Sequence, residues 1–301
     1  MLDFEFILYI AIFINICGFA FVSFLILFYS PKPRKPLNSE KYYQSAHHDK
    51  PQKLKSIFDN PSVELSVVVP AYNESKRLPE MLEEAIEFLE QKRVSDKNFS
   101  YEILVVDDGS QDDTTDVALK IGKKHLNIDL KVLRLEKNRK KGGAVTQGVL
   151  SASGKYVLFA DADGATKFSD LEILEKGTKK IVNDDGFGVG VGSRSHLVNT
   201  DAVVKDTQCG FKLFTRKSTL HIFTNLHVEG WIFDIEVLLI ANYLKIPIIE
   251  VPVNWKEIDG SKVSLIKDSL FMALDLLVIR LNYWLRFWKI KDPHLLKLKS
   301  E

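Results

Sequence analysis

From Glu64 onward, short apolar runs alternate with segments whose apolar residues recur at the spacing of one helix face. The run ELSVVVP, closed by Pro70, precedes one such segment, and YEILVVDD precedes a second. The runs LKVLRL, YVLFAD and FGVGVG continue the alternation, and Ser169 with Glu172 predicts a capping box after YVLFAD. Continuous apolar strands that alternate with helices are typical of a sheet covered on both faces. The pattern therefore predicts an α/β fold with a mainly parallel sheet over residues 63–260.

A different pattern occupies the N-terminus, where residues 6–29 contain no charged side chain. The segment would form about 36 Å of helix, which is enough to cross a hydrocarbon core of about 30 Å. Two acidic residues precede it, and Lys32, Arg34 and Lys35 follow it. Because basic residues favour the cytoplasmic side, we predict a single-pass transmembrane anchor over residues 1–30, with the rest of the chain facing the cytosol. A buried core helix and a cleaved leader are the alternatives.

Two further segments depart from the strand and helix alternation. Residues 31–62 are rich in proline, lysine and arginine, so we predict a solvated basic linker that cannot bury a core and that favours an anionic membrane surface. Residues 265–290 are apolar but carry interleaved charges, which argues against a second simple span. An amphipathic membrane-interface segment over residues 261–301 is the preferred interpretation, with an ordinary core helix as the alternative.

Overall composition narrows the class of protein. The chain has 301 residues, of which 46% are hydrophobic, and its formal net charge is +1. This balance does not favour a nucleic-acid binder. The two cysteines, Cys17 and Cys209, lie far apart in dissimilar surroundings, so a disulfide framework is not expected.

Polar residues gather where three of the predicted strands end. The first strand is followed by PAYNE, the second by DDGS, and the fourth by DAD, which contributes Asp161 and Asp163. Ligands of open α/β sheets bind at the carboxyl ends of the strands, so these residues are expected to line one crevice. Two carboxylates separated by one small residue suit Mg²⁺ or Mn²⁺, which proteins hold through oxygen ligands. Because magnesium usually also binds substrate phosphates, a divalent metal here predicts a phosphorylated ligand.

Each motif also has a purely structural alternative. A DxD triplet is common in loops, and Asp107 and Asp108 would also suit the capping of the helix that follows them. The basic run that ends at Lys141 is either a solvated loop or, with the glycines after it, a phosphate site at a helix N-terminus. The glycines of GVGVGS do not match the GxGxxG spacing, which disfavours a dehydrogenase.

Taken together, the motifs resemble those of one enzyme family. VVVPAYNES, YEILVVDDGSQDDT, NRKKGGAVTQG, VLFADADGAT, GSRSH, DTQCGFKLF, EGWIFDIE and VPVNWKEIDGSK are similar to motifs of the dolichyl-phosphate β-glucosyltransferases, membrane members of the family 2 glycosyltransferases. The resemblance covers nearly the whole chain. It implies a GT-A type nucleotide-sugar-binding fold and inverting transfer of glucose from UDP-glucose to dolichyl phosphate. The implied location is the cytosolic face of the endoplasmic reticulum membrane, and the implied process is protein N-glycosylation.

The resemblance also implies roles for individual residues. Asp161 and Asp163 would bind the metal on the diphosphate, with Asp163 also acting in catalysis. Asp234 would supply a catalytic carboxylate, unless it only begins a helix, and Arg194 and Lys212 would meet phosphate charge. The nucleotide pocket would be lined by the first two strand ends and the basic loop, with Asp108 holding the uridine part: Pro70, Ala71, Tyr72, Glu74, Asp107, Asp108 and Lys141, together with Asp161.

Two alternatives to this function stay open. A related enzyme would transfer mannose from GDP-mannose to the same lipid, and a membrane-bound scaffold would keep the fold without activity. One departure from the family bears on the second alternative. Between Gly192 and Asp206 this chain has a shorter segment than the family usually carries, which puts binding of the acceptor in doubt.

Overall fold

In the computed structural model the chain divides into two compact units. The larger unit comprises residues 33–262 and 290–301, and the smaller unit comprises residues 1–32 and 263–289. The residues that the structure describes are 4–32, 34–194, 204–259 and 265–292.

The larger unit is built around one sheet, which has nine strands among the described residues, in the order β2-β1-β5-β4-β3-β6-β8-β7-β9. Its four central strands, β5-β4-β3-β6, run parallel, as the apolar runs predict. The strands are β1 (Tyr42–Ser45), β2 (His48–Lys53), β3 (Val63–Ala71), β4 (Tyr101–Asp107), β5 (Leu130–Arg134), β6 (Gly154–Ala160), β7 (Val189–Ser193), β8 (Phe211–Thr215) and β9 (Ile248–Pro252).

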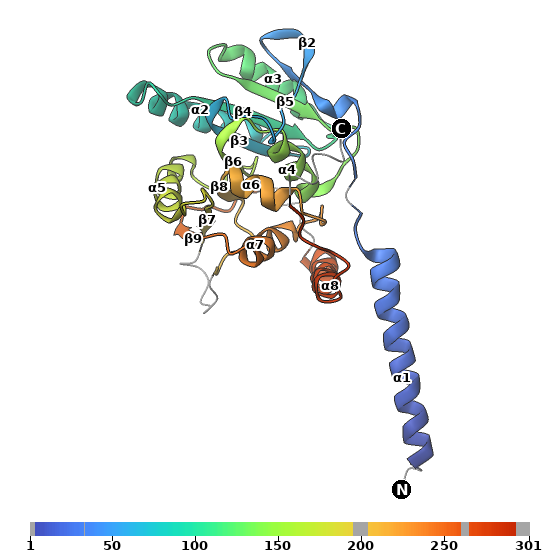
Figure 1. The fold of residues 1–301 in the computed structure, drawn as a ribbon. Coiled ribbons are helices and arrows are strands. Elements are labelled where there is room, and N and C mark those ends of the chain that lie inside the picture. Colours follow the sequence, from blue (N-terminus) through green and yellow to red (C-terminus); the bar gives the residue numbers. More distant parts are fainter. Residues whose placement is uncertain (1–3, 33, 195–203, 260–264, 293–301) are drawn as a thin grey trace. The chain divides into compact units, whose positions relative to one another are not determined.

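Helices cover both faces of this sheet (Figure 1). Alternate residues of β3 point to opposite faces. Val67 and Val69 join the apolar cluster that includes Leu82 of α2, whereas Val68 faces α4, where Gly148 lets the helix approach closely. The helices are α2 (Leu78–Ser95), α3 (Thr114–Lys124), α4 (Lys140–Leu150), α5 (Leu171–Ile181), α6 (Arg216–Phe223) and α7 (Phe233–Tyr243).

The predicted capping box at the start of α5 is wrong. Ser169 lies within a short 3₁₀ helix, η3 (Phe168–Asp170), and α5 begins only at Leu171. Asp170 occupies the N-cap position, and its carboxylate accepts hydrogen bonds from the backbone and side-chain nitrogens of Asn254. The extra turn of 3₁₀ helix moves the start of α5 beyond the reach of a Ser169 cap.

Strand β8 departs from the parallel pattern. It lies between β6 and β7 and runs antiparallel to both, whereas β7 and β9 are parallel to each other. An antiparallel strand begins at the edge of the sheet where its neighbour ends. The residues just before and at the start of β8, Gly210 and Phe211, therefore lie at the carboxyl end of β6.

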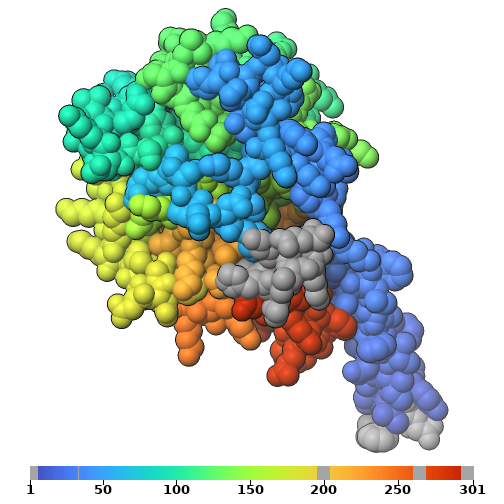
Figure 2. Space-filling view, turned by 45° about the horizontal axis from the view of Figure 1, so that its top comes forward, coloured from blue at the N-terminus to red at the C-terminus, as the bar shows by residue number. Residues whose placement is uncertain are grey.

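The prediction of a solvated linker over residues 31–62 is wrong for much of that segment. Strands β1 and β2 form a hairpin, and β1 pairs antiparallel with β5 at the edge of the sheet. Figure 2 shows the blue atoms of this hairpin lying on the green edge that contains α3 and β5. Main-chain hydrogen bonds to an existing sheet edge do not depend on side-chain polarity, so a polar segment can extend the sheet without a core of its own.

The smaller unit contains the apolar N-terminal helix. Helix α1 (Phe4–Phe24) continues into a π-helical turn, η1 (Leu25–Tyr29). Within the described residues, Phe6–Tyr29 is the one helix long and apolar enough to cross a membrane.

Helix α8 (Leu265–Trp284) is the second element of the smaller unit. It packs on η1, where the Asn282 side-chain nitrogen lies 2.8 Å from the Ser30 hydroxyl oxygen. Several large apolar side chains of α8 are exposed, among them Leu270, Phe271 and Trp284.

Candidate active site

The first two strand ends form one connected structure at the carboxyl edge of the sheet. Ala71 and Asp107 are register partners in β3 and β4, and the backbone nitrogen of Asp108 donates to the Ala71 carbonyl at 2.8 Å. The loop after β3 is held by the loop after β4, since the Asn73 nitrogen donates to the Ser110 hydroxyl at 2.9 Å. The predicted convergence of these two loops is therefore observed.

Asp107 stabilises the loop that begins with Asp108. Its side chain is 1% exposed and accepts hydrogen bonds from the Ser110 backbone nitrogen, at 2.8 Å, and from the Thr115 hydroxyl. Thr115 belongs to the first turn of α3, so the carboxylate joins the strand end to the helix start. These contacts match the structural alternative for Asp107.

Asp108 is directed at the loop that precedes α4. One carboxylate oxygen accepts a hydrogen bond from the Arg139 backbone nitrogen at 2.6 Å. Burial raises the pKa of Asp108 to about 7, although the Arg139 amide and guanidinium oppose that shift. Strongly shifted pKa values cluster at functional sites, so this shift is compatible with a ligand-binding position.

Glu74 forms an ion pair that reaches toward the DxD motif. Its two oxygens lie 2.7 and 2.5 Å from Nε and Nη2 of Arg77, and Nη1 of the same guanidinium lies 4.0 Å from Asp163. The sequence interpretation missed Arg77. The signal was present, because Arg77 follows Glu74 by three residues, the spacing at which charged side chains meet on a helical turn.

Asp161 pairs with Lys141, which reaches it from α4. The ammonium nitrogen lies 2.7 Å from one carboxylate oxygen and 2.9 Å from the other. Burial by itself lowers the pKa of Lys141, but Asp161, Asp234 and Asp163 raise it above the usual value. The same ammonium lies over the rings of Phe159 and Trp231, at 5.7 and 5.9 Å from their centroids.

Gly210 forms the wall behind Asp161. The Asp161 backbone nitrogen donates to the Gly210 carbonyl at 3.0 Å. A Cβ atom built on Gly210 would lie 1.8 Å from Oδ2 of Asp161. The carboxylate thus occupies the space that any larger residue at position 210 would fill.

Asp163 lies in the turn after β6 and keeps part of its carboxylate exposed. One oxygen accepts the Ala165 backbone hydrogen at 3.0 Å, and Gly164 between them has a φ of +69°, which favours glycine. Burial and the Asp161 carboxylate raise the pKa of Asp163. Two mutually repelling carboxylates, each about 30% exposed, provide hard oxygen donors that a divalent cation would neutralise.

These two aspartates fit a metal that the substrate helps to hold. Among the described residues, no group of three or more His, Cys, Asp or Glu side chains is arranged as a metal site. Magnesium is commonly bound by one or two carboxylates together with substrate phosphates. The donor set therefore matches a metal that arrives with a phosphorylated ligand better than a permanent structural ion.

Lys212 and Asp234 form an ion pair in the interior. Their side chains are 0% and 2% exposed, and the Lys212 nitrogen lies 2.6 Å from the Asp234 carboxylate and 2.6 Å from the Cys209 carbonyl oxygen. The predicted contact of Lys212 with substrate phosphate does not fit this burial. Asp234 raises the pKa of Lys141, which pairs with Asp161, but the side chain of Asp234 is itself buried.

Replacing Asp234 by alanine is expected to reduce the free energy of unfolding by about 3–5 kcal/mol, because it leaves the Lys212 charge buried without its partner. Thermal or urea denaturation of the protein in detergent measures the change. The double replacement Lys212→Met with Asp234→Leu is the control, and it should recover most of the loss. Unchanged stability of Asp234→Ala together with lost activity would instead indicate a direct catalytic role.

Arg194 is held by Asp206 across the ends of the shortened segment. Nε and Nη2 of Arg194 lie 2.6 and 2.7 Å from the two oxygens of Asp206, and the guanidinium lies over the Trp255 ring at 5.2 Å. Its predicted contact with phosphate stays a prediction, because the bidentate pair already occupies this face of the guanidinium. Most of the segment itself, residues 195–203, lies outside the described residues.

The comparisons with known proteins agree with this geometry. The family described as Glycosyl transferase family 2 matches residues 66–222, which is more than half of the chain. The chain therefore belongs to glycosyltransferase family 2. In fold it is similar to the crystal structure of glucosyl-3-phosphoglycerate synthase from Mycobacterium tuberculosis with UDP. The TM-score is 0.50 and the identity 17%, over 76% of this chain and 87% of that one.

Relatives within the family are more similar. The dolichyl-phosphate β-glucosyltransferase of Drosophila melanogaster is 46% identical in an alignment of 296 positions that covers 88% of this chain and 90% of that one. The corresponding protein of Homo sapiens is 44% identical in an alignment of 278 positions that covers 84% and 86% of the two chains. These relatives place the chain among the dolichyl-phosphate β-glucosyltransferases and confirm the resemblance that its motifs predict.

Proposed function

We propose that this chain transfers glucose from UDP-glucose to dolichyl phosphate and inverts the configuration at the sugar carbon. The observation that carries the proposal is the charge arrangement at the carboxyl edge. Asp161 and Asp163 lie there with Lys141 and Arg77, at the same edge as Asp108. The named activity of the similar full-length relatives supports the choice of donor and acceptor.

In this proposal the loops after β3 and β4 bind the nucleoside. Pro70, Ala71 and Tyr72 supply the wall of the pocket, and Asp108 accepts a hydrogen bond from the uracil ring. Asp107 acts through Asp108, because its own oxygens are used by Ser110 and Thr115. Glu74 acts through Arg77, which it holds close to Asp163.

The leaving diphosphate is the harder part of the reaction. Asp161 and Asp163 would hold Mg²⁺ or Mn²⁺, and this ion would supply positive charge to the departing UDP. Lys141 and Arg77 add two further cations at the same place. Preorganised charges of this kind stabilise a transition state by several kcal/mol, which is about 10²–10³ in rate for each strong donor.

The acceptor needs little activation. The second pKa of a phosphate monoester is about 6, so dolichyl phosphate is largely dianionic at neutral pH. Its oxygen attacks the anomeric carbon, and the bond from that carbon to the UDP oxygen breaks with its electron pair leaving on UDP. Since no proton has to be removed, Asp234 is proposed to orient Lys141 through its charge and not to act as a general base.

Membrane attachment is the remaining part of the proposal. We place the protein in the endoplasmic reticulum membrane with the larger unit in the cytosol. Support comes from the apolar helix Phe6–Tyr29 and the basic residues that follow it. The exposed apolar side chains of α8 suit a position at the membrane interface. A lipid-borne acceptor requires the enzyme to work at a membrane.

Incubation of the full chain in detergent with labelled UDP-glucose, Mn²⁺ and dolichyl phosphate tests the proposal. The expected product is a labelled glucolipid, with no comparable product from GDP-mannose. Transfer of mannose and not glucose would favour the related mannosyltransferase activity. UDP binding without transfer of either sugar would favour a scaffold that retains the fold.

A further inference from the structure

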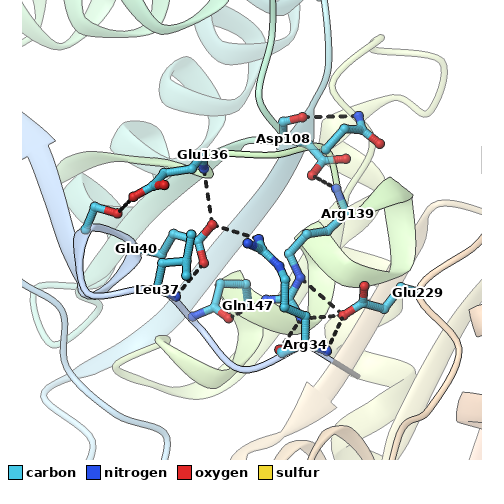
Figure 3. A network of polar contacts seen from close by, with 10 residues as sticks. Arg34, Leu37, Glu40, Asp108, Glu136, Arg139, Gln147 and Glu229 are labelled. Carbon is cyan, nitrogen blue, oxygen red and sulfur yellow. Dashed lines mark hydrogen bonds and ion pairs between the residues drawn. The ribbon is translucent and has the colours of Figure 1, made fainter. Parts of the chain in front are cut away.

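Arg139 connects the nucleotide-binding edge to Arg34, a residue from outside the glycosyltransferase motifs. Arg139 is 6% exposed and acts as the centre of a polar network (Figure 3). Its backbone nitrogen donates to Asp108, and its guanidinium donates to Glu229 and to Gln147, the latter at 3.1 Å. The guanidinium also donates to the backbone carbonyl of Arg34 at 2.8 Å. Arg34 lies in the segment that follows the membrane helix.

Arg34 is itself fixed by a second carboxylate. Its guanidinium lies 2.8 Å from Oε1 of Glu40. Glu40 is 0% exposed and also accepts hydrogen bonds from the backbone nitrogens of Leu37, at 2.8 Å, and Glu136, at 3.1 Å. Burial raises the pKa of Glu40, but these three donors together bring it below the usual value, so the group is a buried anion.

Glu40 thereby connects two chain segments. One is Arg34–Lys41, which we call the juxtamembrane segment, and the other is the loop Glu136–Arg139. The loop holds Asp108 at two points, because the Asn138 side chain donates to the Asp108 carbonyl at 3.1 Å and the Arg139 nitrogen donates to the carboxylate. Glu136 therefore lies in the same four-residue loop as the two groups that hold Asp108.

The same segment also contributes to a cavity. A space of about 680 Å³ lies between the β1–β2 hairpin and the carboxyl ends of β4 and β5, within the usual size range of ligand pockets. Ser39 and Tyr42 line one side of it, and Gly109 and Ser110, which follow Asp108, line another. Ser39 of the juxtamembrane segment, and Tyr42 just after it, therefore line a cavity next to the loop after β4 that is proposed to bind the nucleotide.

We infer that the juxtamembrane segment is part of the nucleotide-binding site, with Glu40 as a positioning residue that sets Asp108 through the loop Glu136–Arg139. The inference rests on the proposed function, in which Asp108 binds the uridine part of the donor. Apolar side chains could pack such a loop without the cost of burying a charge. The buried Glu40 carboxylate instead holds donors from Arg34, Leu37 and Glu136 at defined positions.

Glu40→Gln tests this inference, because glutamine keeps the size of the side chain but removes its charge. The variant is expected to weaken UDP binding about tenfold, since the amide offers one acceptor oxygen in place of two and its hydrogen bonds no longer involve a charged group. The KM for UDP-glucose should rise by a similar factor with kcat nearly unchanged, because Asp108 binds ground state and transition state alike. Glu64→Gln is the matched control. Glu64 pairs with Lys155 at the amino ends of β3 and β6, on the side of the sheet opposite to the proposed nucleotide site.

Calorimetric titration of the full-length protein with UDP, a thermal melt and the glucosyl transfer assay separate the outcomes. Weaker UDP binding at a temperature where Glu40→Gln is folded supports the inference, and rescue by Glu40→Asp would add to it. A lower melting temperature with unchanged UDP affinity would overturn it and leave Glu40 with a structural role only. If the wild type binds UDP but makes no glucolipid, the proposed function fails while the effect of Glu40→Gln on UDP binding still decides the inference.

Discussion

Replacing Asp161 by asparagine is expected to slow glucosyl transfer about a thousandfold, the upper range for loss of one strong electrostatic group. The neutral amide can no longer balance Lys141, which lies 2.7 Å away, and it is a poor ligand for a divalent ion. Initial rates of glucolipid formation at saturating UDP-glucose measure the effect. The melting temperature should change little, because Asp161 is partly exposed.

Asp116→Asn provides the control for this prediction. Asp116 is an exposed aspartate in the first turn of α3, and its side chain is not part of the contacts described above. Its replacement should leave the rate within about twofold, as for most surface substitutions. An Asp161→Asn enzyme with more than a tenth of wild-type activity would contradict the proposed role of this carboxylate.

Gly210→Ala is expected to reduce kcat about a hundredfold, because misplacing a catalytic group by about 1 Å costs this much. The added methyl group would lie 1.8 Å from Oδ2 of Asp161, so the carboxylate has to leave its present position. Rates at saturating donor and acceptor, together with the affinity for Mn²⁺ in the presence of UDP, measure the displacement.

The matched control is Gly122→Ala. Gly122 lies in α3, and the nearest atom to an added Cβ is the Ala46 side chain at 3.5 Å, an ordinary contact distance. Alanine also favours the helix, so stability should rise slightly, by about 0.5–1 kcal/mol, with activity unchanged. Equal kcat values for Gly210→Ala and the wild type would show that Asp161 does not need its present position.

The parallel centre of the sheet, and the position of the candidate site residues at the carboxyl ends of its strands, could both be predicted from local patterns. Runs such as YVLFAD are apolar throughout because both faces of a central strand are covered. The rule that ligands bind at the carboxyl ends then placed Asp108, Asp161 and Asp163 at one edge without any knowledge of distances. The loop contacts between Ala71 and Asp108 confirm that placement for the first two strand ends.

Side-chain pairs between distant segments could not be predicted in the same way. Lys212 was expected at the substrate because the family resemblance implies a role in meeting phosphate charge. Its partner, Asp234, follows 22 residues later in another element, and periodicity within one element does not show such a pair. The same holds for Glu40, whose donors include Glu136 from a segment 96 residues away.

The hairpin of residues 42–53 was missed for a different reason. Its sequence is polar, and β2 is exposed along most of its length. What stabilises β1 is the free edge of β5, which offers main-chain hydrogen bonds to Gln44 and Ser45. Composition describes what a segment can bury, but it does not describe an edge formed elsewhere in the chain.

Because β8 runs antiparallel to β6, one of its ends lies at the candidate active site and the other at a set of structural hydrogen bonds. The strand starts beside Asp161, at the reactive edge, and it ends at Thr215, at the amino edge of the sheet. There Arg216 donates to the carbonyl oxygens of Ser56, Asp59, Ala152 and Gly154 and so ties three segments together. Substitutions at the Thr215 end of β8 are therefore expected to change the thermal stability of the protein without changing kcat. Evolution or an engineer could thus alter stability and activity separately at the two ends of one five-residue strand.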